Sequence, residues 1–195
     1  MTLSFDADTH TYTAGGVPLV SVTTAIKSAG LMGDTSFYTE ESRDRGTAVH
    51  WVTERFDLGT LDCELIDEAL APYLAAYERF RQEHGPVWSH VETKTADLAL
   101  HYAGTVDRAG RLTTCPHPVV LDIKSGGPAA WHRVQLSAYK RLLAAELPAL
   151  ITRYALYLSS EGTYRLEAFP LDDREDWQTF QAALAVAQWK RRYLK

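Results

Sequence analysis

The order of hydrophobic patterns along the chain constrains its fold more than any single motif does. An alternating N-terminal segment is followed by two stretches of helical spacing, and strand-like runs then alternate with helices as far as the C-terminus. Strands and helices in this order form a sheet that packs against helices. We therefore expect an α/β fold with a mixed β-sheet flanked by helices and an N-terminal β-hairpin, in a single domain that spans residues 1–195.

The first half of the chain contains the hairpin and the two helices. Residues 3–26 alternate around Gly15 and Gly16, a pair that suits a tight hairpin turn. Thr39 followed by two glutamates is a helix start. The helix that follows has an apolar stripe made of Ala48, Val49, Val52 and Phe56. A second helix is expected over residues 64–83, ended by His84, Gly85 and Pro86.

The second half contains five strand-like runs and two helices. Strands are expected at 87–98, 101–108, 119–124, 152–159 and 163–169. The first three are expected to be separated by turns near Gly104 and Gly110. A helix is expected to open at Gly126, Gly127 and Pro128 and to reach about Glu146, since proline suits a first helical turn. A last helix is expected at 172–193.

Composition excludes several classes of protein. The net charge of −5 shows no general affinity for nucleic acid, although a local basic surface is sufficient for binding. Two cysteines, Cys63 and Cys115, are too few for a thiolate-ligated zinc or iron–sulfur site, and both are expected to be reduced. The N-terminus lacks the pattern of a signal peptide, and no apolar run approaches the ~20 residues of a membrane span. We expect a cytoplasmic protein.

The run from Val119 to Lys124 carries charges inside an apolar strand. Asp122 and Lys124 are two residues apart and share a face, whereas Leu121 and Ile123 point into packing. Asp107 lies near the end of the preceding strand, so pairing of the two strands brings the carboxylates together. Two close carboxylates repel each other and resist ionisation, and a divalent cation removes that difficulty. Hard oxygen ligands favour Mg²⁺ or Mn²⁺.

Lys124 gives this acidic pair a chemical meaning. Phosphoryl chemistry uses a metal to polarise the phosphate and a cation near the developing negative charge, and the strand supplies residues for both. The alternative is a partly buried salt bridge between Asp122 and Lys124 at a sheet edge, because surface charge pairs usually have no chemical role.

Three further stretches bear on the choice. On the first helix Gly46, His50 and Glu54 fall on one side; the histidine can ligate a metal, and the glycine suggests a close backbone approach. Gln135 and Tyr139 share a helical stripe after the acidic strand, where they can support the acids or contact a phosphate. Glu92 lies in an earlier strand. Each also has an ordinary interpretation, as an incidental histidine, a boundary glutamine with a core tyrosine, and a solvent-facing glutamate.

Four motifs in this order resemble the PD-(D/E)XK nuclease superfamily, and most closely its RecB-like branch of small phage-type exonucleases. They are R-G-x-x-x-H, G-T-x-D, V-x-L-D-x-K-S-G and Q-L-x-x-Y, and they run from Arg45 to Tyr139. The resemblance implies a restriction-endonuclease-like core. It also implies metal ligation by His50, Asp107, Asp122 and the Ile123 carbonyl. It implies catalysis by Asp107, Asp122 and Lys124, supported by Gln135 and Tyr139. Val106 replaces the usual proline, and no iron–sulfur cluster is expected.

The expected activity is that of a Mg²⁺- or Mn²⁺-dependent deoxyribonuclease. The resemblance favours an exonuclease in recombination or repair, which would act in the host cytoplasm if it is phage-encoded, with DNA as partner and a recombinase or single-strand-binding protein as a further candidate. A restriction-type or structure-specific endonuclease on the same core is the alternative, and a silent nucleic-acid-binding module is the alternative of another class. The basic stretch Trp189–Lys195 suits either phosphate contact or ordinary stabilisation of a helix end.

Overall fold

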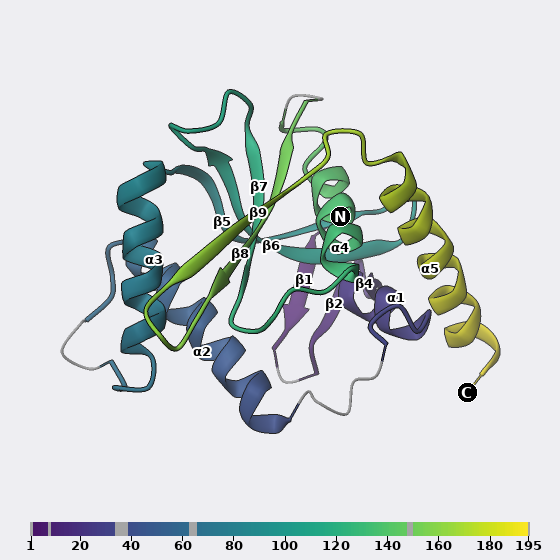
Figure 1. Cartoon of the computed structure of the whole chain (residues 1–195). Coiled ribbons are helices and arrows are strands. Elements are labelled where there is room, and N and C mark those ends of the chain that lie inside the picture. The colour runs from purple at the N-terminus through teal and green to yellow at the C-terminus, as the bar shows by residue number, and fades with distance from the viewer. Residues whose placement is uncertain (1, 8, 34–38, 63–65, 148–149, 195) are drawn as a thin grey trace.

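A mixed sheet lies at the centre of the molecule (Figure 1). The computed structural model describes the chain except for residues 1, 8, 34–38, 63–65, 148–149 and 195. Within the described residues the sheet has the strand order β4-β6-β7-β8-β9, with β5 paired to β6. These strands are β4 Val20–Ser21, β5 Val87–Asp97, β6 Tyr102–Arg111, β7 Val119–Lys124, β8 Thr152–Leu158 and β9 Tyr164–Phe169. The pairs β4–β6 and β7–β8 are parallel and the others antiparallel, as expected of a mixed sheet.

The N-terminal hairpin is confirmed, but it ends earlier than predicted. Strands β1 Leu3–Asp6, β2 Thr11–Ala14 and β3 Val17–Pro18 form a small antiparallel sheet. Both turn glycines have positive φ, 56° for Gly15 and 80° for Gly16, which non-glycine residues rarely adopt. After strand β4, the residues expected to complete the hairpin form helix α1, Val22–Ser28, instead of a strand. Its start is fixed by Ser21, whose Oγ accepts a hydrogen bond from Thr24 N at 3.0 Å.

Helices α2 (Glu40–Asp57) and α3 (Ala71–His84) contribute to the apolar cluster on one face of β7. Helix α2 is capped by Thr39, as the sequence predicts. Helix α3 begins at Ala71 rather than at residue 64, and residues 66–70 are not helical. Pro72 explains this boundary, because proline suits the first helical turn and disrupts a helix interior. Gly85 ends α3 at φ 49°, as expected.

Helix α1, helix α4 (Trp131–Leu142) and helix α5 (Arg174–Tyr193) contribute to the cluster on the other face (Figure 1). The prediction that Pro128 opens α4 is wrong, and the helix also ends before Glu146. Gly126 and Gly127 oppose helix formation through their chain entropy. The segment before the helix is instead held by His132, whose ring Nδ1 accepts a hydrogen bond from Ala129 N at 3.3 Å.

Strand β7 is buried on both faces. Leu121 and Ile123 contribute to the cluster that includes α2 and α3, whereas Val120 contributes to the cluster that includes α1, α4 and α5. Burying each such side chain is worth roughly 1.5–3 kcal/mol, so apolar packing dictates the position of the strand. The predicted α/β architecture, with its mixed sheet, flanking helices and N-terminal hairpin, is confirmed.

The two glycines predicted to mark turns lie inside β6 instead. Gly110 pairs with Trp88 and Val119, and a Cβ at this position would be 2.2 Å from the Val87 carbonyl oxygen. A Cβ at Gly104 would be 2.8 Å from Cε1 of Tyr139. Gly110 therefore permits close packing between strands, and Gly104 permits close packing of helices α1 and α4 on the sheet.

Two composition-based expectations also have structural counterparts. No helix in the described part of the chain is both long and apolar enough to cross a membrane. Cys115 is a free, half-buried thiol near Thr152, and Cys63 lies outside the described residues.

Candidate active site

Strands β6 and β7 separate at the position of the predicted acids. Their paired residues run from Gly110 opposite Val119 to Arg108 opposite Leu121. Beyond this point the Asp107 carboxylate takes over as acceptor, because its Oδ2 receives a hydrogen bond from Ile123 N at 2.7 Å. Asp107 is 5% exposed and Asp122 is 1% exposed, so two acids are buried where the backbone ladder ends.

Asp122 begins a chain of polar contacts that extends into α4. Lys124 Nζ lies 2.7 Å from Asp122 Oδ2 and donates a hydrogen bond to Gln135 Oε1 at 3.0 Å. Gln135 Nε2 in turn donates to the Tyr139 hydroxyl at 3.0 Å. The ring of Trp131 lies under the ammonium, 5.1 Å from Nζ to the ring centroid. The structure thus brings together four residues that the sequence placed on two separate elements.

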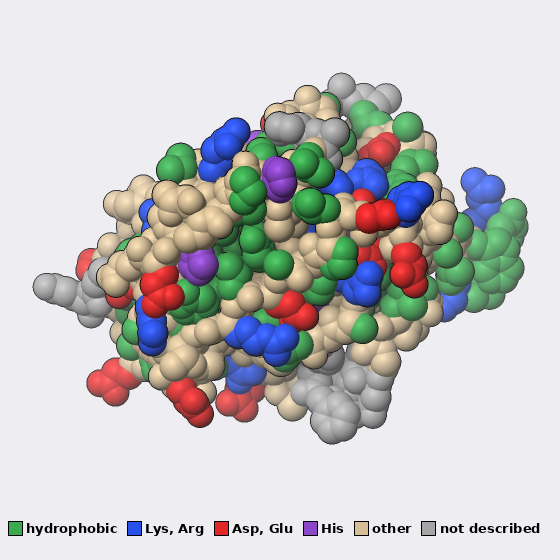
Figure 2. All heavy atoms as spheres, turned by 45° about the horizontal axis from the view of Figure 1, so that its top comes forward, with side chains coloured by type: hydrophobic (Ala, Val, Ile, Leu, Met, Phe, Trp, Pro, Cys, Tyr) green, Lys and Arg blue, Asp and Glu red, His purple; other side chains and the backbone are tan. Residues whose placement is uncertain are grey.

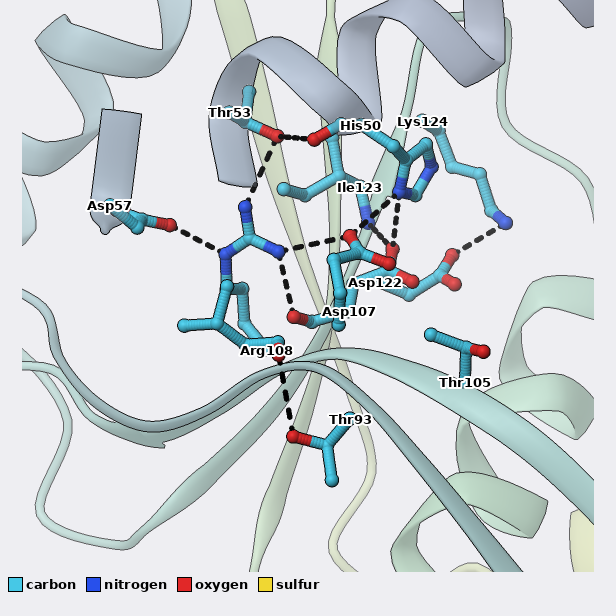
Figure 3. A network of polar contacts seen from close by, with 12 residues as sticks. His50, Thr53, Asp57, Thr93, Thr105, Asp107, Arg108, Asp122, Ile123 and Lys124 are labelled. Atoms are coloured by element: carbon cyan, nitrogen blue, oxygen red, sulfur yellow. Dashed lines mark hydrogen bonds and ion pairs between the residues drawn. The ribbon is translucent and has the colours of Figure 1, made fainter. Parts of the chain in front are cut away.

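Helix α2 brings His50 to the same place. Its Nδ1 lies 3.2 Å from Glu92 Oε1 and 3.6 Å from Asp107 Oδ2 (Figure 3). Gly46, one turn earlier, faces the loop after β7, where a Cβ would be 3.7 Å from Ser125 Oγ, an ordinary contact distance. The glycine is therefore not required by a close approach.

Glu92 is a partner of the site and not a solvent-facing residue. It stands in β5 between Val91, paired with Arg108, and Thr93, paired with Val106, which places it across from Asp107. Its φ of 44° is rare for a residue with a side chain and costs roughly 1–3 kcal/mol. The strand pairing is irregular between Trp88 and His90, so simple alternation did not reveal which way Glu92 points. The feature of the sequence that could have revealed Glu92 as part of the site is its acidic side chain on a strand that pairs with the strand of Asp107.

Sequence reasoning missed Arg108, which is fully buried beside Asp107 (Figure 3). Its guanidinium donates to Asp57 Oδ2 at 2.6 Å, to Glu92 Oε1 at 3.0 Å and to Thr53 Oγ1 at 3.2 Å. It also donates to the backbone oxygen of Asp107 at 2.7 Å. The one feature of the sequence that points to Arg108 is its charge within a strand of mostly apolar and small residues.

Burial and mutual repulsion perturb the acids. Burial raises the pKa of Asp107. The positive charge of His50 opposes this increase, and the negative charge of Glu92 adds to it. Burial also raises the pKa of Asp122 to about 6, against the effect of Lys124 and with the help of Asp107. Burial disfavours the charged imidazole of His50, but Asp107 and Glu92 outweigh burial and raise its pKa to about 9. Without a metal, a proton on His50 therefore supplies positive charge to the cluster.

The donor set fits a divalent cation. One ligand atom each from His50, Glu92 and Asp107 lies within 4.8 Å of the others. Asp122 adds a carboxylate next to this group, and its charge interacts with that of Asp107. Carboxylates favour Mg²⁺ or Mn²⁺, and the imidazole is better suited to Mn²⁺. This group differs from the predicted one by the addition of Glu92, while ligation by Asp122 and the Ile123 carbonyl stays a prediction. In the described chain, Glu54 is not part of the close group.

The end of α5 combines basic and exposed aromatic residues. Lys190 Nζ donates to the backbone oxygen of Ser28 at 2.6 Å, and Arg191 donates to that of Pro18 at 2.9 Å. Both line an open groove of about 510 Å³ between the N-terminal sheet, α1 and α5. Trp189 and Tyr193 are more than half exposed, and Figure 2 shows hydrophobic side chains beside basic ones at this edge. The hydrogen bonds support stabilisation of the helix end.

Comparison with solved structures supports the fold. The chain is similar to a protein from Eubacterium rectale whose name provisionally assigns it as an exonuclease, with a TM-score of 0.56 and 12% identity over 88% of this chain and 82% of that one. An alkaline exonuclease, LHK-Exo, from Laribacter hongkongensis aligns over 90% of this chain and 91% of its own, with a TM-score of 0.38 and 16% identity. No family model and no curated protein matches the sequence. Both of these structures are named as exonucleases, and at 12% identity the similarity to the Eubacterium rectale protein establishes the fold alone.

Proposed function

We propose that the chain is a divalent-metal-dependent deoxyribonuclease of the PD-(D/E)XK superfamily, in its RecB-like branch. One observation carries the proposal: His50, Glu92, Asp107 and Asp122 converge where β6 and β7 separate, and Lys124 lies against Asp122. Acids and an imidazole that can hold a cation, with an ammonium beside them at the end of a buried strand, suit metal-assisted phosphodiester hydrolysis. The fold shared with a protein assigned as an exonuclease supports the same function.

Each residue then has a defined task. His50, Glu92, Asp107 and Asp122 would hold the cation, together with the predicted Ile123 carbonyl. The cation would polarise the phosphate and lower the pKa of an attacking water. Lys124 places an ammonium next to the acids, where it can stabilise negative charge that develops on the phosphate.

Gln135 and Tyr139 position the Lys124 ammonium through hydrogen bonds. Gln135 accepts a hydrogen bond from Nζ, and the Tyr139 hydroxyl holds the Gln135 amide. Burial, followed by the charges of Asp122 and Asp107, raises the pKa of Tyr139 far above its usual value, so the hydroxyl that accepts from Gln135 stays neutral. These two hydrogen bonds restrict the Lys124 ammonium to a narrow range of positions. Such positioning reduces the entropy that is lost on reaching the transition state.

The motifs further support an exonuclease that serves recombination or repair, of the type found in phages. An endonuclease on the same core and a silent nucleic-acid-binding module are the competing functions. Linear and covalently closed circular duplexes of the same sequence, each incubated with Mg²⁺, Mn²⁺ or EDTA, distinguish the three.

An exonuclease degrades the linear duplex and spares the closed circle. Cutting of both substrates with metal would identify an endonuclease. Binding of DNA in a gel-shift assay without any cleavage would identify the silent module and contradict the proposed activity. Labelling the linear duplex at one 5′ end adds the polarity of degradation.

A further inference from the structure

We propose that Arg108 is a positioning residue that holds the metal-binding groups in register, an inference that rests on the proposed function. Arg108 follows Asp107 on β6 and reaches both neighbouring elements of the site, strand β5 and helix α2 (Figure 3). The candidate ligands come from separate elements, so their mutual distances depend on whatever ties these elements together.

The first tie runs through Glu92. Arg108 Nη1 donates to Glu92 Oε1 at 3.0 Å and to the backbone oxygen of Asp107 at 2.7 Å. The same Glu92 oxygen lies 3.2 Å from His50 Nδ1. One carboxylate oxygen is thus shared between the guanidinium and the imidazole, so a shift of Arg108 moves the oxygen that faces the ligand cluster.

The second tie runs to the turn of α2 that begins at His50. Arg108 Nη2 donates to Thr53 Oγ1 at 3.2 Å, and that hydroxyl donates to the His50 backbone oxygen at 3.1 Å. Arg108 Nε donates to Asp57 Oδ2 at 2.6 Å, one turn further along the helix. The rigid planar guanidinium of Arg108 therefore fixes the position of helix α2, and with it the distance between His50 and Asp107.

Fold stability alone explains this arrangement poorly. Asp57 also has Arg81 as an ion-pair partner and receives a hydrogen bond from the Tyr77 hydroxyl, so it does not depend on Arg108 alone. A buried ion network is weak evidence for stability, because apolar replacements are often neutral. Partners of metal ligands, in contrast, orient those ligands and tune their affinity.

The test measures Mn²⁺ affinity by titration calorimetry and unfolding temperature by calorimetric scanning, on wild type, Arg108→Met and Arg108→Lys. The matched control is Arg153→Met, because Arg153 is an equally buried arginine that pairs with Asp176 away from the site. We expect Arg108→Met to lower Mn²⁺ affinity about 10–100-fold. Arg108→Lys should recover part of the affinity, since an ammonium can pair with Glu92 or Asp57 but cannot span both. Arg153→Met should lose stability and keep its Mn²⁺ affinity.

Two outcomes overturn the proposal. One is a folded Arg108 variant with wild-type Mn²⁺ affinity, and the other is an Arg153→Met variant that loses as much affinity as Arg108→Met. If neither Arg108 variant folds, Thr53→Val decides, because it removes one tie and keeps the side-chain shape; unchanged Mn²⁺ affinity would then overturn the inference. A wild type that binds no Mn²⁺ would refute the proposed function itself, whereas binding that Arg108 does not influence refutes only this inference.

Discussion

Two arginine side chains, Arg108 and Arg153, are fully buried, and the groups around them balance their charges differently. Around Arg153, one carboxylate, Asp176, meets two guanidinium groups, since Arg133 also contacts it. Arg153 Nη1 also donates to the backbone oxygen of Arg133 and Nη2 donates to that of Pro170, whereas Nε has no hydrogen-bond partner in the described chain. Two guanidinium groups thus share one carboxylate, so cations are in excess in this cluster, which connects β8, α4 and α5.

Around Arg108 the carboxylates are in excess. Among the described residues, four acids with little exposure face three permanent cations, and the groups are Asp57, Glu92, Asp107 and Asp122 against Arg81, Arg108 and Lys124. His50 supplies the missing charge only by holding a proton, against the cost of its burial. Burial of charge alone therefore does not mark a candidate site, whereas an excess of acids, one of which is the strained Glu92, supports the proposed metal site.

Replacement of Lys124 should have the strongest effect and should separate the lysine from the acids. Lys124→Ala should reduce turnover about 10²–10³-fold, because charge stabilisation of the transition state is lost. Its Mn²⁺ affinity should survive, since a protonated lysine does not ligate metal. Asp122→Ala should lose both. Single-turnover cleavage and titration calorimetry measure the two quantities. Equal Mn²⁺ binding by both variants would show that Asp122 is not a ligand.

Removal of His50 should produce the next effect, on metal preference. The imidazole is a softer donor than a carboxylate, so wild type should cleave faster with Mn²⁺ than with Mg²⁺. His50→Ala should weaken both activities and narrow the ratio between them, as measured by initial rates over a range of metal concentrations. Wild-type rates with both metals in this variant would remove His50 from the site.

Stability should respond in opposite directions in the two regions. Asp176→Asn leaves a buried guanidinium without its carboxylate and should cost about 3–5 kcal/mol of unfolding free energy. Asp122 has a folded pKa of about 6, above the value of an unfolded aspartate, so its ionisation opposes folding as pH rises through 6. Metal-free Asp122→Asn should therefore gain about 1–3 kcal/mol at pH 8 and nothing at pH 3.

Urea denaturation of both variants at the two pH values, in EDTA, provides the measurement. A fall in the stability of Asp122→Asn at pH 8 comparable to that of Asp176→Asn would mean that the site is a second structural cluster. The contrast between the two regions would then disappear.

A weaker effect is expected at the end of α5. If the groove binds DNA, replacing Lys190 and Arg191 by glutamine should reduce the salt dependence of binding, by about 0.9 in the logarithmic slope for each phosphate that the protein no longer neutralises. Fluorescence anisotropy in EDTA, over a series of salt concentrations, measures this slope. Exposed Arg174, at the other end of α5, offers a matched control in Arg174→Gln. An unchanged slope would assign Lys190 and Arg191 to stabilisation of the helix end.

Local periodicity was enough to predict which residues converge in much of the candidate site. Asp122 and Lys124 were identified because two-residue spacing on an apolar strand places them on one face, and Gln135 with Tyr139 because four-residue spacing does so on a helix. Pairing across strands was not readable in the same way. Gly110 resembled a turn residue because its close approach to Val87 comes from a distant strand.

The missed features share a physical cause, since each depends on a residue distant in sequence or on an unusual backbone. The side chains that Arg108 binds are 16 to 55 positions away. Glu92 points inward with a positive φ that alternation does not predict. Helix α1 replaced a strand because the Ser21 cap and the burial of Val22, Ala25 and Ile26 outweighed a β-branched sequence.

Cleavage of a linear duplex by metal-free protein tests the role of the buried acids without intermediate steps. The excess of acids at the site predicts no product in EDTA and restoration of activity by Mg²⁺ or Mn²⁺, with Asp107→Ala inactive under every condition. An exposed acid away from the site, replaced in Asp172→Ala, should leave the restored rate unchanged. Undiminished cutting in excess EDTA would contradict the proposal that these buried acids bind a catalytic cation.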